Sequence, residues 1–283
     1  MKTIVVTGGK GFVGRNLIRL LLENNFKVIS IDEKRSNRRN KNNYNQSFSI
    51  KSFFKEKKKL KKINGIIHLA ALSRNSLSFN NPLKLFKKNL IDTLIILETI
   101  RYLKKKPWFI FSSKKQIEID KKNNLYNLYS ITKESCEKII KSYASNFGIK
   151  SIILRFSDVF GTVDNSKEKV LVKLISTLKK NKKFNIIDPS YKLNYVHVDD
   201  ICEYILFLIK QNPSKNYREI NLYGKKTYFL KDIAFFVKKM INSKSKILIS
   251  KKKYKKTINN KAKTEKFLKL KKEFKKELKF INP

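Results

Sequence analysis

The chain has 283 residues, 41% of them hydrophobic, which is enough to bury a sizeable core in one large domain or in a domain with a smaller lobe. It contains no run of 18 or more apolar residues and no signal-type apolar stretch, so we expect neither membrane insertion nor export, and a cytoplasmic location. The formal net charge is +44, but only 9 of the 66 basic residues are Arg and the Lys residues run along the whole chain, which favours a solvated surface over specific nucleic-acid binding.

Apolar and amphipathic runs alternate through the first 156 residues. In chain order they predict strand 3–7, helix 11–24, strands 27–31 and 65–69, helix 82–103, strand 108–111, helix 127–147 and strand 151–156. Strands that are apolar throughout, such as residues 4–6, are typical of a parallel sheet covered on both faces. The order of elements therefore predicts an α/β fold with a Rossmann-type doubly wound sheet.

The second part of the chain predicts a smaller C-terminal α/β lobe. Its elements are helix 170–180, a return segment 193–198, helix 201–211, a short strand 220–222 and helix 230–241, followed by a Lys-rich amphipathic tail at 251–283. We assign residues 1–165 to the Rossmann domain, with a segment at about 193–212 returning to it. Residues 166–192 and 213–283 are assigned to the lobe, which we expect to bind the substrate.

A cluster of glycines follows the first predicted strand. The chain has only 8 glycines, and four of them lie between positions 8 and 14. Gly8 permits a sharp turn out of the strand, Gly11 lets the backbone approach a pyrophosphate, and Gly14 lets the next helix pack closely on the sheet. Asp32 lies 21 residues after Gly11, at the end of the second strand, where a carboxylate binds ribose hydroxyls and repels a 2′-phosphate. The pattern predicts NAD as cofactor.

Tyr129 and Lys133 lie one turn apart on one face of the predicted helix 127–147. A tyrosine has a pKa near 10, and a neighbouring ammonium would favour its phenolate. In a chain with 12 Tyr and 66 Lys+Arg such a pair also arises by chance, but this one follows the glycine turn and a strand that ends in two serines. We interpret the pair as catalytic. Neither the two cysteines nor the two histidines have metal-ligand spacing, so no metal site is predicted.

Several further segments, taken in order, resemble the extended short-chain dehydrogenase/reductase family, the nucleotide-sugar epimerases and dehydratases in particular. They are His-Leu-Ala-Ala at 68–71, then Pro82, Asn89 and Thr93, Phe-Ile-Phe-Ser-Ser at 109–113, Leu-Arg-Phe-Ser-Asp-Val-Phe-Gly at 154–161, Tyr-Val-His-Val-Asp-Asp at 195–200 and Asn-Leu-Tyr-Gly at 221–224. The resemblance covers almost the full length of the chain.

The resemblance implies a reaction and a set of site residues. Tyr129 would remove a proton from a sugar hydroxyl while NAD takes the hydride from the same carbon, and Lys133 would lower the pKa of Tyr129 and bind the nicotinamide ribose. The implied cofactor-binding residues are Gly8, Gly11, Phe12, Val13, Gly14, Asp32, Leu69, Ala70, Ala71, Asn89, Tyr129 and Lys133. A structural hydrogen bond is the alternative role for Asn89. The family commonly forms homodimers, and we expect one here.

The sequence departs from the family pattern at the substrate positions. Lys114 stands where a serine or threonine normally hydrogen-bonds the reacting oxygen, and we expect Ser113 to substitute as the third catalytic residue. Asp158 replaces an asparagine that binds the diphosphate, and Leu193 replaces an arginine, with Lys192 beside it. We therefore name Asp158 and Lys192 as substrate-binding residues.

These departures leave three hypotheses. The first is an NAD-dependent epimerase or dehydratase that acts on a nucleotide sugar, with a nucleotide-sugar or keto-sugar reductase as a variant. The second is an NAD-binding regulator without catalysis on the same fold. The third is a polyanion-binding protein that uses the basic surface, for which affinity would fall steeply with salt.

Overall fold

The structure is a computed structural model of the whole chain. It describes residues 1–32, 49–55, 60, 62–72, 81–114, 127–161, 169–213 and 216–250, together with the backbone of 44–47. The predicted amphipathic tail at 251–283 lies outside the described residues.

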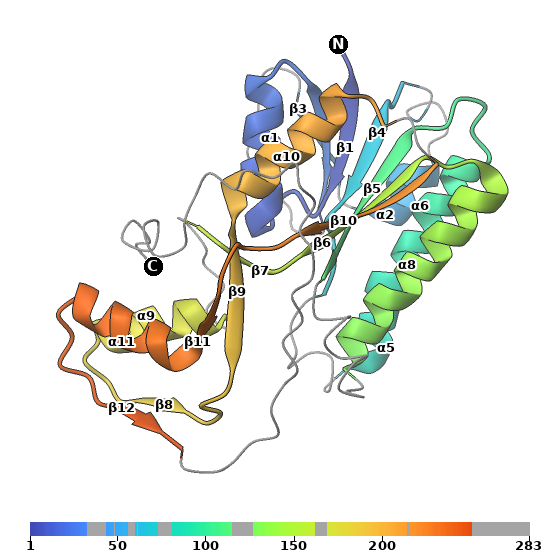
Figure 1. The fold of residues 1–283 in the computed structure, drawn as a ribbon. Helices are drawn as coiled ribbons and strands as arrows, with labels where there is room; N and C mark the ends of the chain where they lie inside the picture. The colour runs from blue at the N-terminus through green and yellow to red at the C-terminus, as the bar shows by residue number, and fades with distance from the viewer. Residues whose placement is uncertain are drawn as a thin grey trace.

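The main sheet contains seven strands among the described residues, all parallel, in the spatial order β3-β2-β1-β4-β5-β6-β10 (Figure 1). The strands are β1 (Thr3–Thr7), β2 (Lys27–Ile31), β3 (Tyr44–Ser47), β4 (Gly65–His68), β5 (Trp108–Lys114), β6 (Ser151–Phe156) and β10 (Tyr217–Leu222). The order reverses direction at β1, which is the topology of a dinucleotide-binding sheet with its ligand crevice beyond the carboxyl ends of the strands. The predicted doubly wound Rossmann-type fold is confirmed.

Alternate residues of each strand point to opposite faces of this sheet, and a hydrophobic core covers each face. Val6 and Ile67 pack in one hydrophobic core with the helices α1 (Phe12–Glu23) and α10 (Val198–Lys210). Val5 and Ile66 pack in a second core with α2 (Ile50–Lys55), α6 (Asp92–Arg101) and α8 (Leu128–Phe147). Figure 1 shows α1 beside α10 on one side of the strands and α6 beside α8 on the other.

A second group of elements forms the smaller lobe. Strand β9 (Lys192–His197) pairs with β7 (Asp158–Phe160) and with β11 (Thr227–Phe229), and β8 (Phe184–Ile186) pairs with β12 (Ile247–Ile249). The helices α9 (Val170–Lys179) and α11 (Leu230–Met240) cover them, and a third hydrophobic core lies between these elements (Figure 1). The predicted C-terminal α/β lobe is therefore present.

Some boundaries differ from the prediction. Residues 217–222, assigned to the lobe from the sequence, form β10 at the edge of the main sheet, because Ile220 and Leu222 complete its first core. The predicted helix 82–103 consists of α5 (Pro82–Phe86), a π-helical turn (Lys87–Ile91) and α6. Helix α10 begins three residues earlier than predicted, because the side chain of His197 caps it by accepting a hydrogen bond from the Asp199 amide at 3.2 Å.

The described residues form neither a membrane-spanning helix nor a metal-binding cluster. Within the described part of the chain, no helix has both the length and the apolar character needed to cross a membrane. The same residues contain no group of three or more His, Cys, Asp or Glu side chains placed to hold a metal ion.

Candidate active site

The glycine turn connects β1 to α1 and packs against the segment that follows β4. Gly8 has a φ of +71°, and a Cβ added there would lie 2.8 Å from the Ala70 backbone nitrogen. A Cβ on Gly14 would lie 2.2 Å from the Gly8 carbonyl oxygen, and the Gly11 amide donates to that same oxygen at 2.9 Å. Glycine is thus required at positions 8 and 14 by the backbone conformation and the close approach of neighbouring backbone.

The start of α1 has the features of an anion site. Gly11 is the N-cap and makes no side-chain capping bond, so the first amides of the helix, including those of Phe12 and Val13, point out of its positive end. The ammonium of Lys10 is enclosed beside this turn, and Nζ has no hydrogen-bond partner among the described residues. A buried ammonium is costly without a counter-charge. A phosphate at the helix N-terminus would supply that charge, so these residues fit a pyrophosphate.

Asp32 lies directly after β2, at the carboxyl edge of the sheet. Its Oδ2 accepts a hydrogen bond from the Lys10 amide at 3.0 Å, which joins the end of β2 to the glycine turn. The Gly8 amide donates to the Ile31 carbonyl at 2.8 Å and adds a second link. The predicted ribose-binding carboxylate therefore stands next to the candidate phosphate site.

A buried histidine fixes the floor of this turn. The Thr7 hydroxyl lies 2.6 Å from Nδ1 of His68, and the Thr93 hydroxyl lies 3.0 Å from Nε2. Because Thr93 donates its proton to the Asn89 carbonyl, Nε2 of His68 is the donor and Nδ1 accepts from Thr7. Burial, and to a smaller degree the charge of Lys133, lowers the pKa of His68 to about 3, so the ring is neutral. This network holds β1, β4 and α6 in register.

The segment after β4 follows the glycine turn at close range. The Leu69 amide donates to the Thr7 carbonyl at 3.2 Å, and the Ala70 amide donates to the Thr7 hydroxyl at 3.2 Å. Leu69, Ala70 and Ala71 are all partly buried. The three residues predicted to line the cofactor site thus border the turn that carries Gly8.

Asn89 lies in the π-helical turn and is buried. Its Oδ1 accepts from the Leu72 amide at 2.8 Å, while Nδ2 donates to the Leu72 carbonyl at 3.2 Å and to the Thr132 hydroxyl at 3.0 Å. Both amide hydrogens of Asn89 are therefore used within the protein. These bonds tie the segment after β4 to α8 one residue before Lys133, which matches the structural alternative for Asn89.

Tyr129 and Lys133 lie in the first turns of α8, which Asn127 caps by accepting hydrogen bonds from the amides of Tyr129 and Ser130. Lys133 is buried, and its Nζ donates to the Ser112 carbonyl at 2.9 Å. The same Nζ lies 4.3 Å from the ring centroid of Phe111. The sequence-predicted pair is thus brought to the carboxyl end of β5, beside the second of the two cores.

The electrostatics of this pair differ from the expectation. Burial lowers the pKa of Lys133 to about 8, against the smaller opposing effects of Cys136 and Glu137. Burial also raises the pKa of Tyr129, and the charge of Cys136 adds to that effect. The predicted lowering of the Tyr129 pKa by Lys133 is not seen in this structure, because the ammonium of Lys133 is directed to the Ser112 carbonyl.

Ser113 and Lys114 occupy the last two positions of β5. The Ser113 Oγ is enclosed and has no hydrogen-bond partner among the described residues. Lys114 is only partly buried, and its Nζ lies 5.9 Å from the ring centroid of Tyr129. The structure therefore places the side chain of Lys114, rather than an accessible Ser113 hydroxyl, next to the predicted base.

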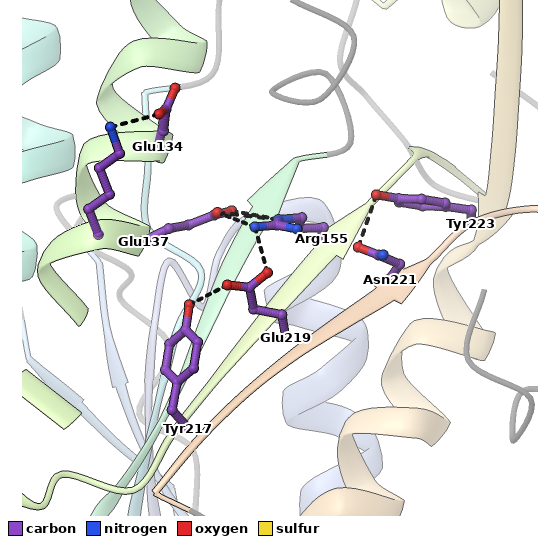
Figure 2. Close-up of polar contacts among 8 residues, drawn as sticks. Glu134, Glu137, Arg155, Tyr217, Glu219, Asn221 and Tyr223 are labelled. Atoms are coloured by element: carbon purple, nitrogen blue, oxygen red, sulfur yellow. Dashed lines mark hydrogen bonds and ion pairs between the residues drawn. The ribbon is translucent and has the colours of Figure 1, made fainter. Parts of the chain in front are cut away.

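A group of charged residues lies between α8, β6 and β10 (Figure 2). The Arg155 guanidinium contacts Glu137 with Nη2 at 2.6 Å and Nε at 3.0 Å, and Nη2 also lies 2.9 Å from Glu219. The Tyr217 hydroxyl donates to Glu219 at 2.7 Å. Glu137 lies one helical turn after Lys133, so the ion pairs fix α8 on the sheet.

The predicted substrate residues lie in the lobe. Asp158 begins β7 opposite Tyr195 of β9. Besides burial, the charge of Asp158 raises the pKa of Tyr195, and also that of Tyr191, which reaches about 12. Lys192 begins β9, and its Nζ lies 4.5 Å from the ring centroid of Phe229 on β11. Asp158 thus faces tyrosines, while Lys192 packs on the neighbouring strand.

Comparison with known proteins decides the family. A family model described as the NAD dependent epimerase/dehydratase family matches residues 4–222. The chain belongs to this family. A putative UDP-glucose 4-epimerase from Methanocaldococcus jannaschii is 30% identical over 218 residues, which cover 71% of this chain and 71% of that protein. The dTDP-D-glucose 4,6-dehydratase of Dictyostelium discoideum is 28% identical over 254 residues, 76% of this chain but 57% of that protein's length.

Solved structures agree on the fold. The UDP-glucose 4-epimerase of Thermotoga maritima, solved with UDP-glucose, superposes with a TM-score of 0.84 at 22% identity, over 98% of this chain and 96% of that chain. WbmF of Bordetella bronchiseptica, solved in complex with NAD+, gives a TM-score of 0.76 at 19% identity, over 89% of this chain and 82% of that one. The prediction of an NAD-dependent family is confirmed.

In this epimerase/dehydratase family member, the structure gathers most of the predicted site residues at one edge of the main sheet. The residues that sequence reasoning missed are Lys10, with its enclosed ammonium, and the contact between Lys114 and Tyr129. Lys10 was not predicted as a site residue, because the chain contains many other lysines. Its position inside a turn of four glycines was the available signal.

Proposed function

We propose that this protein is an NAD-dependent enzyme that epimerises or dehydrates the sugar of a nucleotide sugar through a transient keto sugar. The observation that carries the proposal is the position of Tyr129 and Lys133 at the carboxyl end of β5. This end lies at the edge of the sheet where the glycine turn forms a phosphate-type site. Ligands bind at this edge in sheets of this topology.

The cofactor site would be filled as follows. The amides at the start of α1 and the Lys10 ammonium would hold the pyrophosphate, and Asp32 would accept hydrogen bonds from the ribose hydroxyls. NAD, when bound, supplies a site that accepts a hydride. Lys133 would hold the adjacent ribose by donating a hydrogen bond to its hydroxyls.

The chemistry of the protein residues is proton transfer. Tyr129, as phenolate, would accept the proton of a sugar hydroxyl while the hydride leaves the same carbon, so that this carbon becomes a carbonyl. Return of the hydride to the opposite face of the carbonyl, together with return of the proton from Tyr129, would complete an epimerisation. Loss of water from the keto sugar, followed by return of the hydride and a proton to the unsaturated product, would give a dehydration. Because burial, and to a smaller degree Cys136, raises the pKa of Tyr129, the phenolate depends on cations near the ring.

The substrate is proposed to lie between the sheet edge and the lobe, close to Asp158 and Lys192. Two of the relatives are named for dTDP-D-glucose and UDP-glucose, which supports a nucleoside diphosphate sugar as the substrate class. A homodimer and a cytoplasmic location remain predictions.

A panel of UDP-, dTDP-, GDP- and CDP-sugars tests the proposal. The protein is loaded with NAD, its melting temperature is measured with each sugar, and the products are analysed by mass spectrometry and NMR. Binding to the native state raises the melting temperature. We expect one nucleotide class to stabilise the protein and to be converted. An NAD-induced shift with neither binding nor conversion of any nucleotide sugar would instead favour the non-catalytic regulator.

A further inference from the structure

Lys114 lies beside the ring of Tyr129, the proposed base. It is the last residue of β5, on the strand whose carboxyl end carries the Lys133 contact, and its Nζ lies 5.9 Å from the ring centroid of Tyr129. An ammonium within about 6 Å of an aromatic ring is attracted to it. The attraction becomes much stronger when the ring carries a phenolate charge.

Tyr129 requires such a neighbour. Its hydroxyl group lies in a buried environment that disfavours the phenolate. Among the described residues, the charged and titratable groups near it are Lys133 and Cys136 on α8 and Lys114 on β5. Lys133 directs its ammonium to the Ser112 carbonyl, and Cys136 has no positive charge to offer. Of these groups, Lys114 is the cation whose ammonium faces the Tyr129 ring.

The neighbouring hydroxyl does not serve this purpose. The Ser113 Oγ is enclosed by protein atoms, while Lys114 is partly exposed. A substrate oxygen that approaches Tyr129 would therefore meet the Lys114 ammonium.

We propose that Lys114 is a catalytic residue of this enzyme, which stabilises the phenolate of Tyr129 and donates a hydrogen bond to the sugar oxygen that loses its proton. The hydrogen bond to the sugar oxygen rests on the proposed function, whereas stabilisation of the Tyr129 phenolate does not. Lys114 forms and breaks no covalent bond, because the proton of the sugar hydroxyl moves to Tyr129.

The first role is tested without any sugar. The absorbance of the Tyr129 phenolate is titrated with pH on the NAD-loaded protein, as the difference between the wild type and Tyr129→Phe. We expect Lys114→Met to raise the midpoint of this titration by about one pH unit or more, since an opposite charge at this range shifts a pKa by about 1–3 units. Lys114→Arg keeps the charge and is expected to stay close to the wild type.

Lys141→Met is the matched control. Lys141 Nζ lies 5.8 Å from the ring centroid of Tyr217, which is the same type of contact outside the site, so this variant should leave the Tyr129 midpoint unchanged. Equal midpoints in Lys114→Met and the wild type would overturn the proposal, as would a wild-type Tyr129 that does not titrate below about pH 11. Failure of the sugar panel would count against the proposed function only, because this titration needs no turnover.

Discussion

At the scale of single residues, the cofactor turn requires glycine at positions 8 and 14, where a side chain would meet neighbouring backbone. Gly14 approaches the Gly8 carbonyl so closely that even a methyl group would overlap backbone, which cannot move away as a flexible side chain does. The helix α1 would have to shift away from the turn, and its first amides would shift with it. The same substitution at Gly148 would meet no atom within 4 Å.

Gly14→Ala is expected to abolish the rise in melting temperature that NAD produces, because the phosphate site loses its geometry. Gly148→Ala serves as the control. Gly148 has a φ of +64° but nothing within 4 Å of an added Cβ, so alanine there should cost about 1–2 kcal/mol of stability and leave the NAD-induced shift intact. A normal NAD shift in Gly14→Ala would contradict the assigned turn.

His68 makes the stability depend on pH. Its pKa is about 3 in the folded protein against 6.5 for an ordinary histidine, so between these values the unfolded chain binds a proton that the folded chain does not. The stability that comes from His68 is therefore present above pH 6.5 and is lost as the pH falls towards 3. Relative to a His68→Gln variant, the wild type should lose about 2 kcal/mol of unfolding free energy between pH 7.5 and pH 5.

Urea unfolding of the two proteins at both pH values measures this difference, and subtraction removes the contribution of the other titrating groups. Parallel curves for the wild type and His68→Gln would mean that His68 is not held neutral by the bonds to Thr7 and Thr93.

At the scale of secondary-structure elements, α8 is the element on which the site depends. One turn carries Tyr129 and Lys133, and the next carries Glu137, which anchors the helix to β6 through Arg155 (Figure 2). The exposed fractions of the Arg155 and Glu137 side chains are 15% and 7%, so the pair is shielded from water. Removing one member of a buried ion pair leaves the other charge uncompensated.

Glu137→Gln is expected to lower the free energy of unfolding by about 3 kcal/mol, with Glu219 retaining part of the interaction with Arg155. Glu134→Gln on the same helix is the control, because Glu134 pairs with Lys138, whose side chain is 74% exposed, and its loss should cost less than about 0.5 kcal/mol. Urea denaturation measures both. Equal losses in the two variants would show that burial does not set the strength of the pair.

Sequence periodicity identified the buried elements and missed those whose pattern is weak. The strand β3 and the short helix α2 escaped prediction, and so did β8 and β12, which are three residues long and too short to show a period. The π-helical turn at Lys87–Ile91 was also not predicted, because its sequence fits an ordinary helix.

The site was predictable where chemistry demands a residue type. Gly8 and Gly14 have no substitutes in their turn, and Tyr129 with Lys133 has a spacing that only a helix can use. The environment of Lys133, which points to a backbone carbonyl, was not predictable, since no sequence pattern encodes the direction of a lysine side chain. Burial of Ser113 beside a partly exposed Lys114 is likewise a tertiary detail that no sequence pattern encodes.

At the scale of the whole molecule, the two parts of the chain divide the work. In the proposed function the main sheet supplies the cofactor turn and the proton-transferring pair, and the lobe supplies Asp158 and Lys192. The net charge of +44 is far larger than these few site lysines require. In the proposed function this charge attracts anions in general and assists the approach of a nucleoside diphosphate, an effect that weakens as salt is added.

The proton-transfer role of Tyr129 is the central claim, and turnover of Tyr129→Phe with the nucleotide sugar that the panel identifies tests it most directly. We predict that kcat falls by about 10²–10⁴-fold, the contribution typical of a positioned acid-base group, while NAD still raises the melting temperature of the variant. Full turnover by Tyr129→Phe would contradict the claim.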